Sequence, residues 1–366
     1  MIKQYTALGL MSGTSMDGVD ASIIQSDGEM KHQLLIDKYF EYPQKIYDSL
    51  VEVREKINSS KDLKILSKEL NKLERDITLF HAKVVNEILK KSKTNIDIIG
   101  FHGQTIFHNS SEKISKQLGD GRLLSQLTKK DIVYNFRQND LNNGGEGAPL
   151  TPIYHKILAN KFNIKPVTLI NIGGILNRTT INAHGELSAK DEGPGMCLID
   201  KWIRIKSKKK YDINGDLANS GKTNKIILDQ YIDNFLSRNE NKNSYDTNDF
   251  DLSFARGLSL EDGTSTITSI TINIINSLAL INKDPEIQKR MILCGGGRKN
   301  KFIVQGIKDF NSKVKLIDDY GVDGDFVESQ AFAYLAIRAL LKLPISFPKT
   351  TGCSNPCTGG TIIKAT

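Results

Sequence analysis

The pattern of apolar and polar positions along the chain predicts a mixed α/β protein. Short apolar runs, typical of buried strands, cover residues 5–11, 19–24, 96–101, 132–134, 167–172, 175–181 and 291–293. Stretches with apolar residues three and four positions apart, typical of helices, cover residues 44–92 with a break at 58–60, 150–161, 196–205 and 328–343. Strands and helices therefore alternate along the whole chain.

One unusual element occurs twice in this pattern. Residues 5–11 and 19–24 predict a hairpin whose tip is rich in glycine, and residues 167–181 predict a second hairpin interrupted by Gly173 and Gly174. The repetition predicts a duplicated architecture, with two similar α/β lobes and a cleft between them. No segment resembles a flexible linker, and residues 237–248 are expected to form the most exposed loop.

Length and composition are those of an ordinary globular protein. The chain has 366 residues and a mass of 40.8 kDa, with 39% hydrophobic and 25% charged residues, which excludes disordered, collagen-like and coiled-coil classes. No apolar run approaches the length of a membrane helix, and the N-terminus lacks the features of a signal peptide. The sequence therefore predicts a cytoplasmic protein.

The net charge of +8 does not by itself indicate nucleic-acid binding. The excess comes from lysines dispersed along the chain, and the one dense basic run, residues 206–210, contains no aromatic residue. Four cysteines are too few and too scattered for a disulfide framework or a CxxC metal site, so we expect all of them to be reduced. They are Cys197, Cys294, Cys353 and Cys357.

Three glycine-rich turns, each after a predicted strand, are the first candidates for chemistry. They lie at residues 13–18, 173–174 and 295–297. Glycine lets backbone N–H groups approach an anion closely, and Thr14 and Ser15 add hydroxyl donors. A single such turn is usually structural, but three of them, two on matched hairpins, predict a nucleotide site.

Other familiar motifs fail their tests. Residues 216–223 end in Gly-Lys-Thr, but the first glycine of a P-loop is missing, so we expect a solvated loop and a helix start. No GxGxxG occurs, and Ser12 lies in GLMSG rather than in GxSxG. His102 and His108 have no third metal ligand near them in the sequence, so we expect strand-end histidines with satisfied hydrogen bonds.

A carboxylate suited to general-base chemistry stands beside a Gly-Pro-Gly turn. Asp191 precedes residues 193–195 and the predicted helix 196–205, a position where aspartate usually caps a helix or forms a turn. The same turn would also fix a carboxylate rigidly, as a general base requires. Glu192 is the alternative base.

Taken together, these segments resemble the anhydro-N-acetylmuramic acid kinases, a peptidoglycan-recycling family of the sugar kinase, Hsp70 and actin superfamily. The matching motifs run in order through nearly the whole chain: residues 9–20 (GLMSGTSMDGVD), 102–105 (HGQT), 136–137 (FR) with Asp140, 144–150 (GGEGAPL), 171–175 (NIGGI), Asp191 with 193–195 (GPG), 198–200 (LID), 294–297 (CGGG), and Glu328 with 331–333 (AFA).

The resemblance implies the fold and the activity. It implies two actin-like (ribonuclease H-like) lobes, residues 1–133 plus 344–366 and residues 134–343, with an interlobe cleft for nucleotide and sugar. The implied enzyme is an ATP- and Mg²⁺-dependent kinase that hydrolytically opens 1,6-anhydro-N-acetylmuramic acid and phosphorylates O6, giving N-acetylmuramic acid 6-phosphate. A homodimer is also implied. Composition and charge, as argued above, predict a cytoplasmic protein that binds neither membrane nor nucleic acid.

The resemblance further assigns roles to individual residues. Asp191 is the expected catalytic base, with Glu328 as a second catalytic residue. The expected nucleotide-binding residues are Gly13, Thr14, Ser15, Met16, Asp17, Gly18, Val19, Asp20, Asn171, Gly173, Gly174, Gly295, Gly296 and Gly297. The expected sugar-binding residues are His102, Gln104, Arg137 and Gly193. Asp17 is the expected Mg²⁺ carboxylate, with Asp20 as the alternative.

Three positions depart from the family pattern, and two other functions stay open. Glu192, Met196 and Asn243 replace the usual residues, which concerns the fine shape of the sugar site. One alternative is a kinase for a related anhydro sugar without the lactyl group, such as anhydroglucose. Arg137 is the cation expected to distinguish the two sugars. The other alternative is a nucleotide-driven scaffold of the actin and Hsp70 type.

Overall fold

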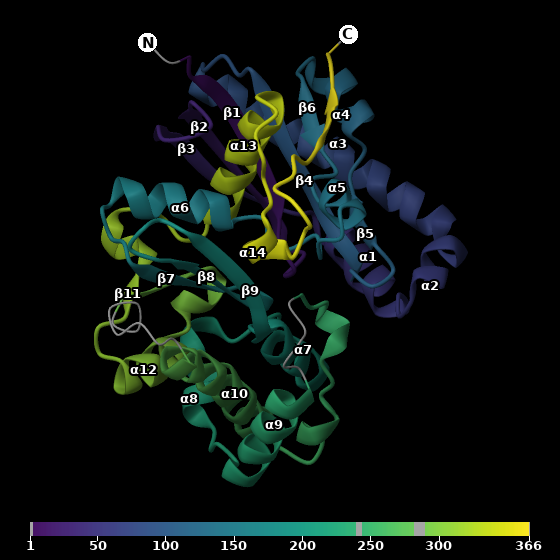
Figure 1. Cartoon of the computed structure of the whole chain (residues 1–366). Helices are drawn as coiled ribbons and strands as arrows, with labels where there is room; N and C mark the ends of the chain where they lie inside the picture. Colours follow the sequence, from purple (N-terminus) through teal and green to yellow (C-terminus); the bar gives the residue numbers. More distant parts are fainter. Residues whose placement is uncertain (1–2, 239–243, 282–289, 366) are drawn as a thin grey trace. The chain divides into compact units, whose positions relative to one another are not determined.

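The computed structural model describes residues 3–238, 244–281 and 290–365. The chain forms two compact units, one of Met1–Lys161 with Phe326–Thr366 and one of Phe162–Asp325. Each unit contains one β-sheet and its own helices (Figure 1). The units differ from the predicted lobes, because residues 134–161 and 326–343 belong to the first unit rather than the second.

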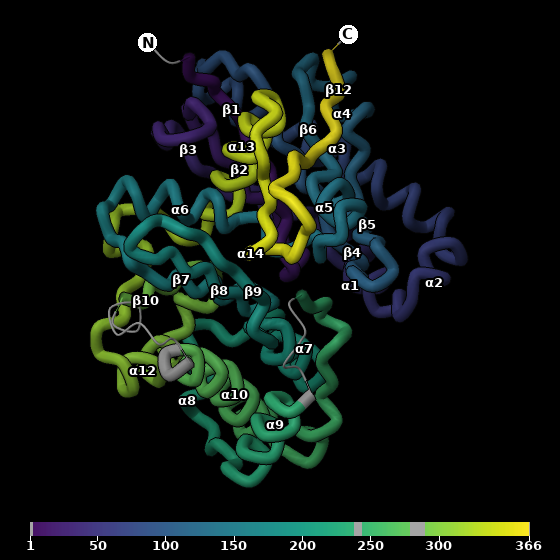
Figure 2. Tube along the Cα trace, viewed as in Figure 1, coloured from purple at the N-terminus to yellow at the C-terminus, as the bar shows by residue number. Residues whose placement is uncertain are grey.

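The first unit is built on a sheet of order β12-β6-β4-β1-β2-β3, with β5 paired to β4. β1, β2 and β3 form an antiparallel meander, whereas β4 runs parallel to both β1 and β6. Figure 2 shows β12, near the C-terminus, beside β6. The strands are β1 (Tyr5–Ser12), β2 (Gly18–Ser26), β3 (His32–Glu41), β4 (Ile98–Asn109), β5 (Ile114–Leu118), β6 (Ile132–Tyr134) and β12 (Thr361–Ile363).

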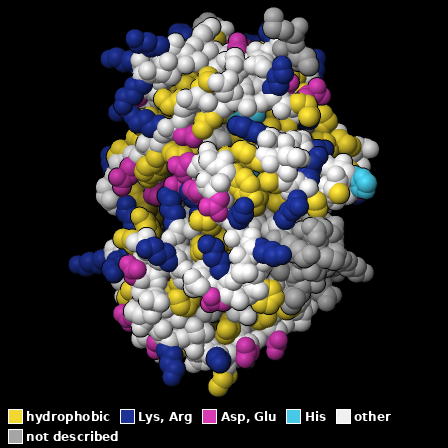
Figure 3. Space-filling model, turned by 90° about the vertical axis from the view of Figure 1, so that its left-hand side faces the viewer, with side chains coloured by type: hydrophobic (Ala, Val, Ile, Leu, Met, Phe, Trp, Pro, Cys, Tyr) yellow, Lys and Arg dark blue, Asp and Glu magenta, His cyan; other side chains and the backbone are white. Residues whose placement is uncertain are grey.

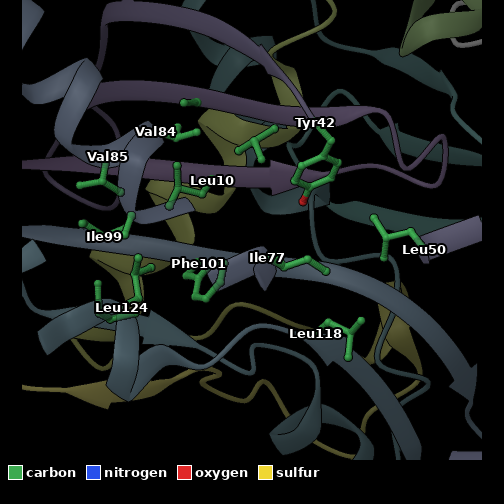
Figure 4. Close-up of a cluster of buried hydrophobic side chains, with 14 of the residues drawn as sticks. Leu10, Tyr42, Leu50, Ile77, Val84, Val85, Ile99, Phe101, Leu118 and Leu124 are labelled. Carbon is green, nitrogen blue, oxygen red and sulfur yellow. The ribbon is translucent and has the colours of Figure 1, made fainter. Parts of the chain in front are cut away.

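Helices pack on both faces of this sheet. Leu10, Phe101 and their neighbours meet residues such as Ile77 and Val84 in a core on one face (Figure 4). On the other face α13 lies so close that a Cβ at Gly9 would stand 1.9 Å from the Ser329 carbonyl oxygen. The helices are α1 (Gln44–Lys56), α2 (Ser60–Ile65), α3 (Ser67–Ser92), α4 (Gly121–Thr128), α5 (Gln138–Asn142), α6 (Pro152–Lys161), α13 (Val327–Leu340) and α14 (Pro348–Thr351).

The second unit has a sheet of order β11-β10-β7-β8-β9. Its core includes Ile170, Trp202 and Ile270. The strands are β7 (Val167–Ile172), β8 (Ile175–Ile181), β9 (Leu187–Pro194), β10 (Met291–Cys294) and β11 (Lys315–Leu316). The helices are α7 (Cys197–Lys206), α8 (Asp216–Ser220), α9 (Lys225–Arg238), α10 (Leu260–Ile281) and α12 (Lys301–Phe310).

The two sheets repeat one topology. In each, three consecutive strands form an antiparallel meander, and the first of them also pairs in parallel with the next strand of the chain, β4 or β10. That strand pairs in parallel with one further strand, β6 or β11. The resulting orders, β3-β2-β1-β4-β6 and β9-β8-β7-β10-β11, are those of a ribonuclease H-like lobe. The predicted α/β class, its duplication and its two glycine-tipped hairpins are therefore confirmed.

Several local predictions need correction. β4 continues through His102 to Asn109, so the segment 102–105 lies within a strand and not after one. The strands β3, β5 and β9 were not predicted, and β9 places Asp191 in a strand rather than in a turn. Residues 216–223 form α8 and an exposed loop, as predicted. Asn243 lies outside the described residues.

The face of the molecule drawn in Figure 3 agrees with the interpretation of the charge. On the face drawn in Figure 3, Lys and Arg side chains are spread among acidic, apolar and other groups rather than gathered in one stripe. No described helix combines the length and hydropathy that a bilayer crossing needs. The four cysteines are free thiols, as predicted.

Candidate active site

The first glycine turn joins β1 to β2 and presents two hydroxyl groups. The Met16 amide donates to the Gly13 carbonyl at 3.2 Å, and Met16 takes a positive φ of 58°. Thr14 and Ser15 are exposed at the tip, and Ser15 Oγ donates to Asp17 Oδ1 at 2.5 Å. The side chains of Met16 and Val19 are buried in the core. These two residues can therefore offer only backbone groups to a ligand.

A buried chain of hydrogen bonds supports this turn from the protein core. His81 Nδ1 lies 2.8 Å from the Ile77 carbonyl, which can only accept, so Nδ1 carries the proton and Nε2 accepts. Ser12 Oγ, 3.3 Å from that Nε2, is then the donor to it and accepts from Tyr42 Oη at 2.9 Å. The Tyr42 amide also donates to the Asp17 carbonyl at 2.8 Å. Tyr42, Ser12 and His81 thus hold both ends of the turn.

The same burial predicts a pH dependence of stability. Burial lowers the pKa of His81 to about 4, and the pKa values of His32 and His155 to about 4 as well. Since an unfolded histidine titrates near 6.5, the unfolded chain binds these protons first as the pH falls. The free energy of unfolding should therefore drop between pH 6.5 and pH 4, by up to roughly 3 kcal/mol for each histidine.

Urea unfolding at a series of pH values measures this dependence. His81→Gln removes one of these buried histidines and should make the slope in that pH window less steep. A wild-type slope of zero between pH 6.5 and pH 4 would contradict the neutral, buried state of these histidines.

A second set of polar groups lies where β4 passes the turn. Gln104 is fully buried, and its Nε2 donates to the Gly13 carbonyl at 2.9 Å. His102 Nδ1 donates to the Gly103 carbonyl at 2.7 Å, so its Nε2 accepts from Arg137 Nη2 at 2.9 Å. Burial and the Arg137 charge hold the pKa of His102 well below its usual value. His102 is therefore a neutral acceptor that orients Arg137.

A β-bulge separates the two candidate base residues. Opposite β8, Leu176 faces Gly193 and Asn177 faces Asp191, so Glu192 is the extra residue. Asp191 is buried, and its Oδ2 accepts from the Tyr245 amide at 3.1 Å. Glu192 instead pairs with Arg178 at 2.6 Å. The bulge thus gives Asp191 a fixed orientation, whereas Glu192 is already occupied by a cation.

The glycine turns of the second unit lie against one another. The Met196 amide donates to the Gly173 carbonyl at 2.8 Å, and a Cβ at Gly195 would stand 2.2 Å from that carbonyl oxygen. At the other side, a Cβ at Gly295 would stand 2.2 Å from Asn171 Oδ1. Residues 171–174, 193–195 and 295–297 therefore form one cluster of backbone turns around the end of β7.

Comparison with known proteins now identifies the family. The chain matches the sequence model of anhydro-N-acetylmuramic acid kinase over residues 5–365. The chain belongs to this family. Two relatives of that name, from Pelagibacter ubique and Rhizobium etli, are 55% identical over 373 residues and 37% identical over 365 residues. The Pelagibacter match covers 100% of both chains, and the Rhizobium match covers 98% of both.

Two solved structures also match at low identity. One is the activator of 2-hydroxyisocaproyl-CoA dehydratase from Clostridium difficile with bound ADPNP, at 13% identity and a TM-score of 0.42, covering 91% of this chain and 94% of that one. The other is component A of (R)-2-hydroxyglutaryl-CoA dehydratase from Acidaminococcus fermentans, at 11% identity and a TM-score of 0.46, covering 92% of this chain and all of that one.

The residues that the kinase family pattern predicts fall into two groups in this structure. In the first unit lie residues 13–20, His102, Gln104, Arg137 and Glu328, the last in the first turn of α13. In the second unit lie Asn171, Gly173, Gly174, Asp191, Gly193 and residues 295–297.

Three residues that support the candidate turns were not predicted from the sequence. Tyr42 and His81 contact the first turn through Ser12, and Arg298 anchors the third turn. The Arg298 guanidinium is buried, and it bonds Asp318 at 2.7 Å, Asp325 at 2.6 Å and the Gly295 carbonyl at 3.2 Å. An arginine just after a glycine run is the only sequence signal of this anchor.

Proposed function

We propose that this chain is an ATP-dependent kinase that opens 1,6-anhydro-N-acetylmuramic acid with water and phosphorylates O6, giving N-acetylmuramic acid 6-phosphate. The observation that supports this most is the family match over residues 5–365, together with 55% identity to a relative named for this activity. Neither alternative, an anhydroglucose kinase or a nucleotide-driven scaffold, has a comparable observation in its favour.

Asp191 is proposed as the general base. Ring opening requires water to attack the anomeric carbon while O6 leaves, and ATP, when bound, supplies the γ-phosphoryl group that O6 takes. A glycosidase needs a general acid for its leaving group, but phosphorylation replaces that acid, so the attack of water itself needs only one basic carboxylate. Asp191 Oδ2 is held by the Tyr245 amide, which orients the carboxylate to take the proton of the water. Glu328 is proposed as a second catalytic carboxylate.

The glycine turns are proposed to bind the nucleotide. A Cβ at Gly296 would meet nothing within 4 Å, and at Gly13 only Ser15 Oγ at 3.7 Å, so both turns leave room for a ligand. We assign phosphate contacts to residues 13–20 and to Asn171, Gly173 and Gly174, and adenosine contacts to residues 295–297. The Asp17 carboxylate is suited to Mg²⁺, mostly through water, with Asp20 as the alternative.

Arg137 is proposed to bind the lactyl carboxylate that distinguishes the muramic sugar. Its two hydrogen bonds to His102 Nε2 and to the Gly147 carbonyl, at 2.9 and 2.8 Å, fix the plane of the guanidinium. A planar, fixed guanidinium is well matched to a carboxylate. His102, Gln104 and Gly193 complete the proposed sugar contacts, with His102 acting through Arg137.

Product analysis tests the function directly. The purified chain is incubated with ATP, Mg²⁺ and 1,6-anhydro-N-acetylmuramic acid in ¹⁸O-labelled water, and the mass of the product is measured by mass spectrometry. We expect the 6-phosphate with one ¹⁸O atom at the anomeric position. If anhydroglucose, offered in its place, is phosphorylated at the same rate, the related sugar kinase is favoured. If the rate of ATP hydrolysis does not depend on the sugar, the scaffold is favoured.

Thr14→Val should weaken the use of ATP without unfolding the protein. The substitution removes one exposed hydroxyl, and hydrogen bonds to charged groups contribute about 1.5 to 3 kcal/mol, so kcat/KM for ATP should fall about ten- to a hundredfold. Thr361→Val, at an exposed position on β12, is the matched control and should leave ATP kinetics unchanged. If Thr14→Val has the wild-type kcat/KM for ATP, the first turn is not part of the nucleotide site.

The homodimer follows only from the resemblance, whereas the location was predicted from the sequence features above. We propose a homodimer in the cytoplasm that contacts neither membrane nor nucleic acid. Sedimentation equilibrium of the full chain measures the mass of the assembly, and a monomer at micromolar concentration would contradict the dimer.

A further inference from the structure

Two thiols and one carboxylate lie together in the first unit, and none of these three residues has been given a role above. Asp140 comes from α5, and Cys353 and Cys357 come from the irregular segment after α14. One carboxylate oxygen and the two Sγ atoms all lie within 4.8 Å of one another. Within the described ranges of the chain, no other three His, Cys, Asp or Glu side chains come together in this way.

The carboxylate of the cluster is oriented by its own hydrogen bonds. Asp140 Oδ1 accepts from Thr351 Oγ1 at 2.6 Å, and Oδ2 accepts from the Gly147 amide at 2.7 Å. Oδ1 also lies 3.8 Å from Cys357 Sγ. Metal-binding carboxylates in proteins are typically held by such outer hydrogen bonds, which fix the direction of the lone pairs. Asp140 is thus prepared for a partner on the side of the two thiols.

The three ligand atoms are buried, but they lie beside an exposed stretch of chain. Cys353 is buried, but Cys357 is half-buried, and residues 354–356 between the two cysteines are exposed. A local movement of the exposed residues 354–356 would therefore be enough to admit an ion and the water that completes its coordination.

We propose that Asp140, Cys353 and Cys357 bind one Zn²⁺ ion, with water as the fourth ligand. Zn–S bonds of about 2.3 Å and Zn–O bonds of about 2.0–2.2 Å in a tetrahedron place ligand atoms roughly 3.3–3.8 Å apart, so small movements close the cluster on the ion. Two thiolates select Zn²⁺ over Mg²⁺ and Ca²⁺, which prefer oxygen ligands. Each thiol releases one proton as it binds.

The ion would tie the C-terminal segment to a loop that supports Arg137. The Glu146 amide donates to the Thr351 carbonyl at 2.8 Å, and the Ser354 amide donates to the Asn143 carbonyl at 3.1 Å. The Gly147 carbonyl accepts from Arg137 in turn. Zn²⁺ should therefore raise the melting temperature of the chain, because it binds the folded arrangement of residues far apart in sequence.

Metal titration of the reduced, chelator-treated full chain tests the proposal without an activity assay. Zn²⁺ is titrated in competition with a chromogenic chelator, and Co²⁺ is titrated while the thiolate-to-cobalt absorption in the near ultraviolet is recorded. We expect one ion per chain. Cys353→Ser and Cys357→Ser should each lower the affinity more than a hundredfold, and Thr351→Val should lower it ten- to a hundredfold.

Cys197→Ser is the matched control, because it removes a half-buried thiol from the second unit and leaves the cluster intact. It should bind Zn²⁺ like the wild type, and the melting temperature of each variant reports whether it folds. The proposal is overturned if the reduced wild type binds no stoichiometric Zn²⁺, or if both serine variants at 353 and 357 bind it with wild-type affinity. It is also overturned if the two thiols only form a disulfide with oxidised glutathione and bind no metal after reduction.

Discussion

Asp191→Asn should lower turnover about 10²- to 10⁴-fold, which is the contribution of a positioned general base. The amide oxygen can still accept from the Tyr245 amide, so the side chain keeps its place, but it can no longer take a proton from water. Initial rates of product formation at saturating ATP and sugar measure the effect. Binding of ATP and sugar, measured by calorimetry, should stay close to that of the wild type.

Glu192→Gln is the matched control, one residue further along the same bulge. It breaks the ion pair between Glu192 and Arg178, and both side chains of this pair are mostly buried. The melting temperature should therefore fall slightly, while turnover per folded molecule stays near normal. Asp191 is not the base if the Glu192→Gln enzyme is inactive, or if the Asp191→Asn enzyme is destabilised but active.

The two hairpins were predictable because their signals are local. A glycine turn between two apolar runs is visible in any short window, and the second copy at residues 167–181 indicated the duplication. The strand order of each sheet then follows the fold that the motifs imply. The lobe boundaries were less predictable, because α13 joins the first unit through its contacts with β1, β2 and β4, all more than 200 residues earlier in the chain.

The strands that were missed lack a local signal. β9 contains Lys190, Asp191, Glu192, Gly193 and Pro194, a composition typical of a turn, and it is a strand because β8 supplies its hydrogen-bond partners. The bulge within β9 depends on that pairing, so the different surroundings of Asp191 and Glu192 could not be derived from the sequence.

The supporting residues of the site were missed for the same reason. Tyr42 and His81 lie 30 and 69 residues from Ser12 in the sequence, and each could be an ordinary core residue in its own segment. Only the folded unit shows that both residues bond to Ser12, at the start of the first turn. In contrast, Thr14 and Ser15 could be named as candidates from the sequence, because they stand beside glycines in one short segment between two predicted strands.

Gly295→Ala should destabilise the second unit strongly. Gly295 has φ 79° and ψ 170°, a conformation reserved almost entirely for glycine, and an added Cβ would stand 2.2 Å from Asn171 Oδ1 and 2.9 Å from the Ile172 backbone. Backbone strain and overpacking together should cost about 2 to 5 kcal/mol. The melting temperature of this unit should then fall by roughly 5 to 15 °C.

Gly296→Ala separates this packing effect from nucleotide binding. A Cβ at Gly296 meets nothing within 4 Å, so the melting temperature without ligand should stay within about a degree of the wild type. If adenosine packs on the 295–297 turn as proposed, the methyl group enters its space, and KM for ATP should rise while kcat changes little. Unchanged KM in a stable Gly296→Ala enzyme would place the adenosine elsewhere, and a stable Gly295→Ala enzyme would contradict the contact between the third turn and the end of β7.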